Sequence, residues 1–353
     1  MLPPGIDDKL RAGCVIPAHP LALTDDCRLD EQRQRVLTRY YLAAGAGGLA
    51  VGVHTTQFAI HDPTVGWYRP VLQLAAETAD TFCAAATREA PILIAGIVGD
   101  TKQAVEEAIT ARELGYHIGL LSLTALRGRS TNELIDHARN VGRVIPLMGF
   151  YLQETISGMV LPRDFWQRLV EIEEIVAIKI APFNRYQTLD VLEAVAASGR
   201  GGEIALYTGN DDNILIDLLT SWEFATGGRV VELAIVGGLL GQWACWTKRA
   251  VEHLDRVKEI RAVKHSIPQD MLTLAAQMTL ANRAVFDAEN GFAGCIPGIS
   301  YALKKQGLMA NTQTLAANER LSPDQATQID QIVRNYPHLI DDEFVKQNIA
   351  SWM

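Results

Sequence analysis

Short apolar runs alternate with longer amphipathic segments along most of the chain. The runs are rich in β-branched residues and are apolar on both faces, which is typical of strands in a parallel sheet covered by helices. Most begin about 26–35 residues apart, with one longer gap. The eight runs are GCVIPAH from Gly13, GGLAVGV from Gly47, PILIAGIV from Pro91, HIGLLSL from His117, VIPLMGFY from Val144, EIVAIKIAP from Glu174, EIALYTG from Glu203 and VVELAIVGG from Val230.

The segments between these runs have the apolar spacing of helices. Val36, Leu37, Tyr40 and Ala44 would share one helix face, and Ser130 with Glu133 forms a capping box at a helix start. Eight β-then-α units in series predict an α/β protein with a (β/α)8 TIM barrel. A doubly wound open sheet is the competing architecture, but it usually has fewer strands.

The pattern also predicts where the barrel ends. We expect the barrel to span residues 1–260. Residues 261–353 form a C-terminal helical region, beginning with MLTLAAQMTLANRAVFDAEN from Met271. Because no Gly/Ser-rich linker separates the two, we expect this region to pack on the barrel.

Composition and charge narrow the classes of function. The 353 residues are 48% hydrophobic and 21% charged, and the net charge is −9, which argues against a nucleic-acid partner. A local positive pocket can still bind an anionic small molecule. The five cysteines are scattered, so neither disulfides nor a zinc site is predicted. With no signal peptide or membrane span in the pattern, we expect a cytoplasmic protein.

Candidate chemistry is sought at the carboxyl ends of the strands, where barrel enzymes have their active sites. Those positions hold the following residues: His19, His54, Thr55, Thr56, Ser122, Thr124, Tyr151, Lys179, Asn184, Arg185, Tyr207, Thr208, Gly209, Asn210, Asp211, Gly237 and Gly238. His54 and His61 have no carboxylates at metal-ligand spacing, so no metal is expected. Asp211 and Asp212 fit a helix cap as well as a substrate contact.

Lys179 is the most informative of these residues. It lies inside the otherwise apolar run IVAIKIA, and lysine is almost never fully buried without a partner. Burial lowers the pKa of an ammonium group, which favours the neutral amine that forms imines. The alternative is a lysine at a strand end in a structural ion pair.

Tyr151 and the two threonines have weaker signals. A tyrosine hydroxyl at the end of VIPLMGFY can carry protons to or from a bound carbonyl substrate, although aromatic residues often simply close a barrel layer. Thr55 and Thr56 can hold a carboxylate with hydroxyl and backbone N–H groups, but threonines are common at strand ends.

Together these positions resemble the dihydrodipicolinate synthase / N-acetylneuraminate lyase family of class I aldolases. The shared order is a threonine pair after the second strand, a tyrosine after the fifth, and a lysine on the sixth about 28 residues later. Here these are Thr55-Thr56, Tyr151 and Lys179, and the segment 207–211 looks like the family's Ser-Gly-Asp-Asp turn. The resemblance covers nearly the whole chain from about Gly13.

The resemblance implies a Schiff base on Lys179, a proton relay through Tyr151 and a 2-oxo acid, often pyruvate, held by Thr55 and Thr56. It implies no metal or organic cofactor, because the protonated imine serves as the electron sink. It also implies a homo-oligomer, either a dimer or a tetramer. The expected substrate-binding residues are Thr55, Thr56, Asn184, Arg185, Tyr207, Gly209 and Gly237.

The chain departs from the family pattern at several positions. The family's Gly-Thr-Thr-Gly-Glu is His54-Thr55-Thr56-Gln57-Phe58 here, so a different loop shape is expected. Ile156 stands where the synthases place an arginine for the carboxylate of their aldehyde substrate. We therefore expect no use of aspartate semialdehyde, with Arg185 as the replacement cation for another substrate.

Two classes of function remain after these comparisons of residues. The first is a class I lyase, an aldolase or dehydratase, acting on pyruvate or a sugar-acid derivative through a Lys179 imine. The second is a barrel of the same fold that binds a metabolite without turnover, since the synthases' second relay tyrosine has no match in SLTALRGRS.

Overall fold

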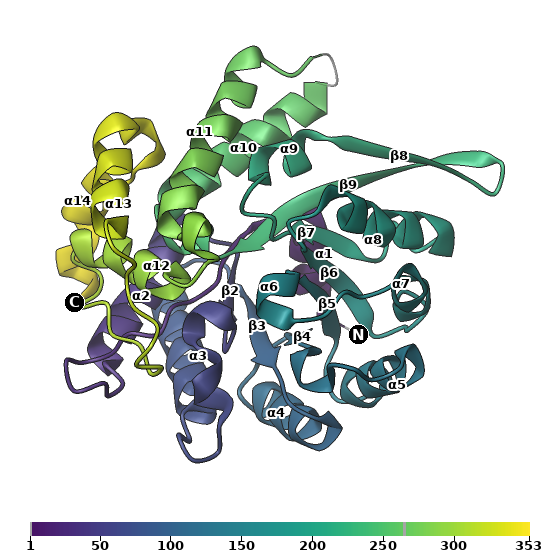
Figure 1. The fold of residues 1–353 in the computed structure, drawn as a ribbon, viewed down its shortest axis with the longest axis horizontal. Coiled ribbons are helices and arrows are strands. Elements are labelled where there is room, and N and C mark those ends of the chain that lie inside the picture. The colour runs from purple at the N-terminus through teal and green to yellow at the C-terminus, as the bar shows by residue number, and fades with distance from the viewer. Residues whose placement is uncertain (1, 264–265) are drawn as a thin grey trace. The chain divides into compact units, whose positions relative to one another are not determined.

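The computed structural model describes residues 2–263 and 266–353. In these residues, eight parallel strands alternate with helices and are followed by a helical C-terminal region, so the predicted (β/α)8 fold class is confirmed (Figure 1). Each strand coincides with one predicted apolar run. The strands are β1 (Val15–Pro17), β2 (Gly48–Val51), β3 (Ile92–Ile97), β4 (Ile118–Leu121), β5 (Leu147–Leu152), β6 (Ile175–Ala181), β7 (Ala205–Thr208) and β9 (Arg229–Leu240).

The chain divides into two compact units, and each is described by itself. The first unit comprises residues 1–14 and 92–239. Its strands lie in the order β3-β4-β5-β6-β7-β9, and every neighbouring pair is parallel. Its helices are α1 (Pro4–Ala12), α4 (Thr101–Glu113), α5 (Thr131–Gly142), α6 (Glu154–Ser157), α7 (Arg163–Leu169), α8 (Arg185–Ser198) and α9 (Ile214–Leu219).

The second unit comprises residues 15–91 and 240–353. Besides β1 and β2 it contains α2 (Glu31–Ala44), α3 (Tyr68–Ala85), α10 (Thr247–Val263), α11 (Gln269–Val285), α12 (Cys295–Lys305), α13 (Gln325–Asn335) and α14 (Asp342–Trp352). The domain boundary predicted at residue 260 therefore lies within α10.

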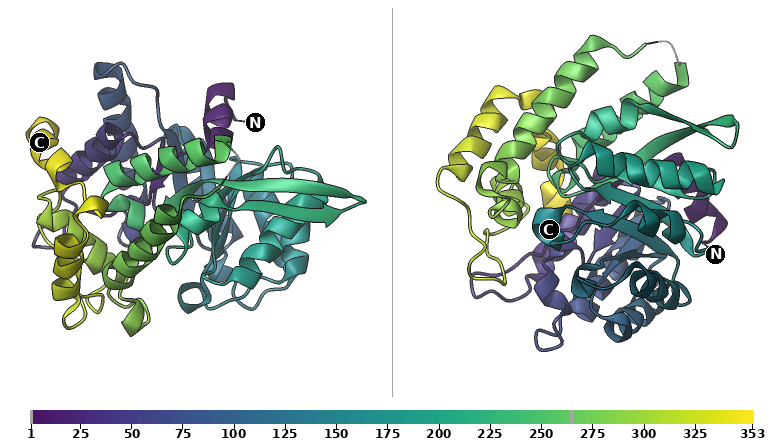
Figure 2. Two further views of the ribbon diagram at one scale, coloured as in Figure 1. Left: turned by 90° about the horizontal axis from the view of Figure 1, so that it is seen from above. Right: turned by 45° about the vertical axis from the view of Figure 1, so that its right-hand side comes forward.

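The C-terminal helices of this unit pack against an early helix. Figure 2 shows α14, in yellow, beside α2, in purple. The Tyr40 hydroxyl on α2 donates a 2.7 Å hydrogen bond to the buried carboxylate of Asp341, and the Tyr40 and Trp352 rings lie 5.6 Å apart. The last helix is thus held to α2 by both an apolar and a polar contact.

Local sequence signals explain several helix starts. α5 begins with the predicted capping box, in which Ser130 Oγ accepts from the backbone N–H of Glu133 and the Glu133 carboxylate accepts from that of Ser130. Asp30 and Asp100 cap α2 and α4 in the same position. Within residues 2–263 and 266–353, no helix combines the length and the apolar character that a membrane crossing requires.

One strand was not predicted. β8 (Ser221–Thr226) pairs antiparallel with the first half of β9 and forms the long ribbon labelled in Figure 1. Gly227 and Gly228 join the two strands, with φ values of 56° and 75°. A two-residue turn with positive φ at both positions favours glycine, and it matches the twist of a hairpin.

Gly237 illustrates how closely the backbone is packed in the first unit. A Cβ at this position would lie 2.5 Å from the Cys14 carbonyl oxygen and 2.7 Å from Tyr207 Cε1. Close packing therefore explains this glycine, which the sequence assigned to substrate binding.

We expect Gly237→Ala to lower the free energy of unfolding by about 1–3 kcal/mol or more, because backbone atoms must move to admit the methyl group. Gly202→Ala is the matched control, since a Cβ there would meet nothing within 4 Å. Urea unfolding of the two variants measures the difference, and equal stability would contradict the packing argument.

Candidate active site

Lys179 lies in the middle of a row of residues that the sheet register defines. Across the first unit, Phe150 on β5 pairs with Lys179 on β6, Lys179 pairs with Tyr207 on β7, and Tyr207 pairs with Gly237 on β9. Paired residues of neighbouring strands point to the same face of a sheet. The four positions therefore face the same side, and the lysine side chain is buried there, with 8% of its surface exposed.

Two neighbours enclose the lysine side chain. Its Nζ lies 4.4 Å from the centroid of the Phe150 ring, a cation–π distance. On the other side the turn after β7 approaches so closely that a Cβ at Gly209 would lie 2.7 Å from Lys179 Cε. Gly209 was predicted to bind substrate, and the structure shows that it makes room for the lysine.

The environment changes the acidity of this lysine. Burial lowers the pKa of Lys179 to about 8, although the negative charge of Asp211 acts in the opposite direction. At pH 7 a pKa of 8 leaves roughly one amine in eleven neutral, against about one in 2,500 at the ordinary lysine pKa. At neutral pH a larger share of this amine is therefore neutral and nucleophilic than in an exposed lysine.

A buried carboxylate holds the turn that contains Gly209 and Asp211. Asp217 on α9 is fully buried and accepts hydrogen bonds from Thr208 Oγ1 at 2.7 Å and Asn210 Nδ2 at 2.9 Å. Asn210 in turn accepts from the backbone N–H of Phe183 in the loop after β6. The loops after β6 and β7 are therefore fixed to each other by buried hydrogen bonds.

The same carboxylate engages the arginine that was predicted to bind substrate. Arg185 Nη1 lies 2.5 Å from Asp217 Oδ1, and its guanidinium stacks 5.9 Å from the Trp222 ring. Asn184, the other residue predicted in this loop, caps α8 by accepting from the N–H groups of Tyr186 and Gln187. Both side chains have structural roles, and their contact with substrate stays a prediction.

Tyr151 lies on the other face of β5 from the lysine row. It pairs with Ile180, the residue after Lys179, so its side chain points away from the face that holds the amine. The hydroxyl donates to the Leu161 carbonyl at 3.2 Å, and the ring packs 5.0 Å from that of Trp166 on α7. Burial raises the pKa of Tyr151 to about 12. The predicted proton relay through Tyr151 is not supported by this placement.

An irregularity in the pairing of β5 with β6 explains why Tyr151 does not face Lys179. Leu147 pairs with Ile175, 28 residues later, but the register shifts directly afterwards and Met148 pairs with Ala177, 29 residues later. A shift of one residue moves every following side chain to the opposite face. Tyr151 and Lys179 are 28 residues apart, so the shift brings Phe150 beside the lysine instead.

The threonine pair belongs to the second unit. Thr55 and Thr56 form the 3-10 turn η1 (His54–Thr56), and their hydroxyls donate to the carbonyls of Ala18 at 2.7 Å and His19 at 2.6 Å. Thr56 Oγ1 also accepts from the N–H of Gly52. These bonds tie the loop after β2 to the segment after β1, and carboxylate binding by the pair stays a prediction.

The altered threonine loop has an unusual backbone. Gln57 has a φ of 67°, a conformation that favours glycine, and it occupies the position where the resembling family has glycine. Its side-chain oxygen accepts a 2.6 Å hydrogen bond from the Leu315 N–H. The loop thus keeps a backbone conformation suited to glycine despite the substitution, and the Gln57 side chain holds the segment at Leu315 by a hydrogen bond.

Tyr207 shares the row of Lys179, but its hydroxyl is already bonded. It donates to the Leu10 carbonyl at 2.8 Å and lies 3.6 Å from Cys14 Sγ. Burial raises its pKa well above the usual range. This tyrosine anchors the N-terminal segment of the first unit, and its predicted contact with substrate stays a prediction.

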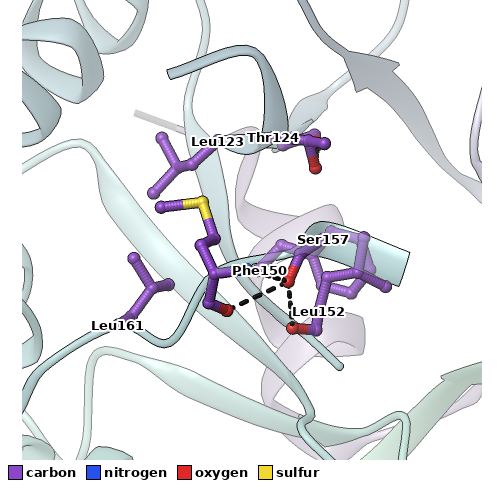
Figure 3. Close-up of a pocket in the computed structure, with 8 residues that line it drawn as sticks. Leu123, Thr124, Phe150, Leu152, Ser157 and Leu161 are labelled. Atoms are coloured by element: carbon purple, nitrogen blue, oxygen red, sulfur yellow. Dashed lines mark hydrogen bonds between the residues drawn. The ribbon is translucent and has the colours of Figure 1, made fainter. Parts of the chain in front are cut away.

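A small pocket adjoins the lysine row at the ends of β4 and β5. Figure 3 shows the residues that line it. The lining residues are Ser122, Leu123, Thr124, Phe150, Leu152, Ser157, Met159 and Leu161. Phe150 both lines this pocket and contacts the Lys179 amine.

Phe150 was not predicted as a site residue from the sequence, and Asp211 was considered there without being assigned a role. The signal for Asp211 was its place in the turn after β7, but a helix cap explained it equally well. Among the residues that the structure describes, no group of three His, Cys, Asp or Glu side chains is placed to hold a metal ion.

Comparison with known proteins gives a consistent result. The sequence model of the dihydrodipicolinate synthetase family matches residues 12–221. A 4-hydroxy-tetrahydrodipicolinate synthase of Staphylococcus saprophyticus subsp. saprophyticus is 27% identical over 126 residues, which is 35% of this chain and 41% of that protein.

Solved structures share the fold over most of the chain. An N-acetylneuraminate lyase from Fusobacterium nucleatum is 16% identical with a TM-score of 0.71, covering 92% of this chain and 99% of the other. A chloride-inhibited dihydrodipicolinate synthase from Acinetobacter baumannii, complexed with pyruvate, is 18% identical with a TM-score of 0.73, covering 92% and 98%.

The lowered pKa of Lys179 can be tested by its reactivity with acetic anhydride. We expect acetylation of Lys179 to rise about tenfold per pH unit and to level off near pH 8, because only the neutral amine reacts. Peptide mass spectrometry follows the rate, and the exposed Lys102 in the same sample is the internal comparison. In Asp211→Asn the plateau should begin at lower pH, since the carboxylate that raises the pKa is gone. A rate that still rises tenfold per unit above pH 9 would contradict the assignment.

Proposed function

Because the chain belongs to the dihydrodipicolinate synthetase family, we propose that it is a class I lyase that forms an imine between Lys179 and a 2-oxo acid such as pyruvate. The observation that carries the proposal is a lysine buried on an apolar strand, with its pKa lowered to about 8 by burial. The pyruvate complex of the Acinetobacter baumannii synthase supports the choice of a 2-oxo acid.

The proposed first step joins the two reactants and releases water. The neutral Lys179 amine attacks the C2 carbonyl carbon of the acid, and the resulting carbinolamine loses its oxygen as water to give the protonated imine. Loss of a proton from C3 then converts the imine to an enamine, whose electron pair can attack an aldehyde carbon, which is aldol condensation, or expel an oxygen substituent from C4, which is dehydration. Aldol cleavage runs in the opposite direction: the C3–C4 bond of the imine breaks, its electron pair forms the enamine, and an aldehyde is released.

We propose Asp211 as the group that carries the C3 proton. Asp211 belongs to the turn that covers the lysine side chain, and its charge acts directly on the Lys179 amine. A carboxylate beside the protonated imine both stabilises the cation and accepts a proton. Tyr151 is less suited to this step, because its side chain lies on the other face of β5 and its hydroxyl is bonded to Leu161.

Two parts of the assignment rest on the family resemblance. The carboxylate of the 2-oxo acid is assigned to Thr55 and Thr56, whose hydroxyls otherwise hold the loop to the carbonyls of Ala18 and His19. The protein is also proposed to be a homo-oligomer, a dimer or a tetramer. Sedimentation analysis distinguishes these states from a monomer. A cytoplasmic location is proposed separately, from the sequence pattern.

Covalent trapping tests the imine. With borohydride and pyruvate, we expect Lys179 to gain the mass of the acid less one oxygen atom, because the imine forms with loss of water and is then reduced. Peptide mapping locates the adduct, and Lys179→Met removes it. A broad panel of 2-oxo acids that gives no adduct at Lys179 would rule out the mechanism. An adduct without any turnover would favour a barrel that only binds metabolites.

Exchange of the pyruvate methyl protons with D2O separates the two proton carriers without knowledge of the second substrate. We expect Asp211→Asn to form the reduced adduct but to slow exchange by about 10²–10⁴-fold, the usual effect of losing a positioned acid–base group. Tyr151→Phe should stay within a few-fold of the wild type. NMR measures both rates, and the reverse pattern would assign the relay to Tyr151.

A further inference from the structure

The β8–β9 ribbon of the first unit has a free strand edge. Among the residues that the structure describes, β8 pairs only with the first half of β9, so its other edge has no neighbouring strand. Figures 1 and 2 show the ribbon extending past α8 of the same unit. A two-stranded ribbon is only marginally stable by itself in water, and an unpaired edge is a template for another strand. A further strand can therefore add at this edge.

The free edge lacks the features that usually block pairing. β8 reads SWEFAT, with neither proline nor lysine. All six of its residues pair with β9 in one unbroken register, so no bulge twists the edge away. Proline, lysine and bulges are common means of protecting an exposed edge. Glu223 is the one charged residue of the strand, and its position restricts the register of any added strand.

The turn of the ribbon determines which backbone groups face the free edge. Two glycines with positive φ form a two-residue hairpin turn, so the flanking pair of Thr226 and Arg229 is hydrogen-bonded. Bonded and non-bonded pairs alternate along an antiparallel ribbon. Trp222, Phe224 and Thr226 therefore bond to β9. The remaining residues of the strand direct their N–H and C=O groups to the free edge: Ser221, Glu223 and Ala225.

The base of the ribbon is fixed to the rest of the first unit. Trp222 Nε1 donates to the Asp217 carbonyl at 3.4 Å, and the indole ring lies 5.9 Å from the Arg185 guanidinium. Further along the same face, Phe224 and Val231 are only partly buried. The ribbon thus presents its free edge from a held base, with apolar surface still accessible beside it.

A second copy of β8 can pair with this edge about a two-fold axis perpendicular to the ribbon. Such an axis keeps every side chain on its own face of the sheet, so it lies beside one residue, which then pairs with its own copy. Axes at Glu223 and at Phe224 give the longest overlaps, residues 221–225 and 222–226. The charges of the ribbon distinguish these two registers.

Like charges exclude the axis at Glu223. Glu223 already faces Glu232 across the ribbon, so that axis would place both carboxylates of each copy in one row of the sheet. Like charges directly opposite each other are destabilising. The axis at Phe224 instead pairs Glu223 with Ala225 of the second copy. It also aligns Phe224 and Val231 of both copies in one apolar row, and such cross-strand pairs are stabilising.

We propose that β8 is a self-association edge, through which two copies of this chain form a four-stranded antiparallel sheet with the two-fold axis at Phe224. The backbone groups of Glu223 and Ala225 in each copy bond to those of Ala225 and Glu223 in the other. The proposal does not depend on the imine chemistry of Lys179. It goes beyond the proposed homo-oligomer by assigning an interface to a ribbon that has a free edge.

Proline substitutions test the edge. Ala225 and Val230 face each other at a non-hydrogen-bonded position, so neither N–H is used between β8 and β9. We expect Ala225→Pro to halve the mass of the assembly in sedimentation velocity, because each copy loses one hydrogen bond to the other and the proline ring obstructs the edge. Val230→Pro is the matched control on the β9 edge and should keep the wild-type mass. A monomeric wild type, or an equal loss in both variants, would overturn the proposal.

A disulfide test locates the axis. In the proposed dimer Phe224 meets its own copy at a non-hydrogen-bonded pair, where the Cα atoms are ~4.5 Å apart and within reach of a disulfide. Val231 is three strand spacings from its copy, ~14 Å, which is too far. On mild oxidation we expect Phe224→Cys to give a dimer in which two copies of the substituted peptide are joined. Val231→Cys should give no more dimer than the wild type, whose five cysteines provide the background.

The outcomes of the disulfide test separate this interface from other modes of assembly. Dimers joined through Val231→Cys and not through Phe224→Cys would assign the interface to β9 and overturn the proposal. An oligomer that gives no cross-link in Phe224→Cys would also overturn it, while leaving intact a homo-oligomer formed through another surface. Borohydride trapping at Lys179 is independent of both results.

Discussion

The burial of one amine on an apolar strand is the constraint around which the first unit is arranged. An ammonium group loses hydration when it is buried, so the charged form of Lys179 is disfavoured. Neighbouring residues either stabilise the charge or leave space for the side chain. Phe150 offers its ring face to the amine, and position 209 has no side chain because the lysine occupies that volume. Asp211 then supplies the opposite charge that keeps the pKa from falling further.

A second buried charge, Asp217, makes this arrangement rigid. It fixes Thr208 and Asn210 and, through Asn210, the loop after β6, so both segments beside the lysine are held from one point. Arg185 balances the carboxylate from the more exposed side. Burying a carboxylate is unfavourable unless it is paired and hydrogen-bonded, and here both conditions are met. The chemistry proposed for Lys179 thus depends on a residue that has no part in it.

The sequence predicted the fold well because its signals are local and repeated. All eight parallel strands coincide with apolar runs, since each run depends only on residues a few positions apart. The β8–β9 hairpin escaped because its outer half is largely exposed and is not a continuous apolar run, although Gly227-Gly228 is a hairpin signal. The position of Lys179 in the middle of a buried strand was also predictable, because the lysine interrupts a run of apolar residues.

The contacts of the lysine were harder to predict. They depend on which residues of neighbouring strands stand in one row, and nothing in the letters of VIPLMGFY marks the register shift after Leu147. Asn184 lies in the segment after β6, as predicted, but Arg185 is the first residue of α8. Their partners come from α9 and from the start of α8. Contacts between residues that are far apart in the sequence depend on tertiary packing, which cannot be predicted from a single sequence.

The shift in β5 also bears on how relatives of this protein are compared. A sequence alignment matches two tyrosines when the residues around them are similar, so Tyr151 is aligned with the tyrosine of the family motif. After a bulge, two residues that match in an alignment can point to opposite faces of the sheet. Here the residue before the tyrosine, Phe150, is the one that contacts the lysine. In a comparison based on letters alone, the position that faces the lysine would then be overlooked, because it lies one residue before the tyrosine of the recognised motif.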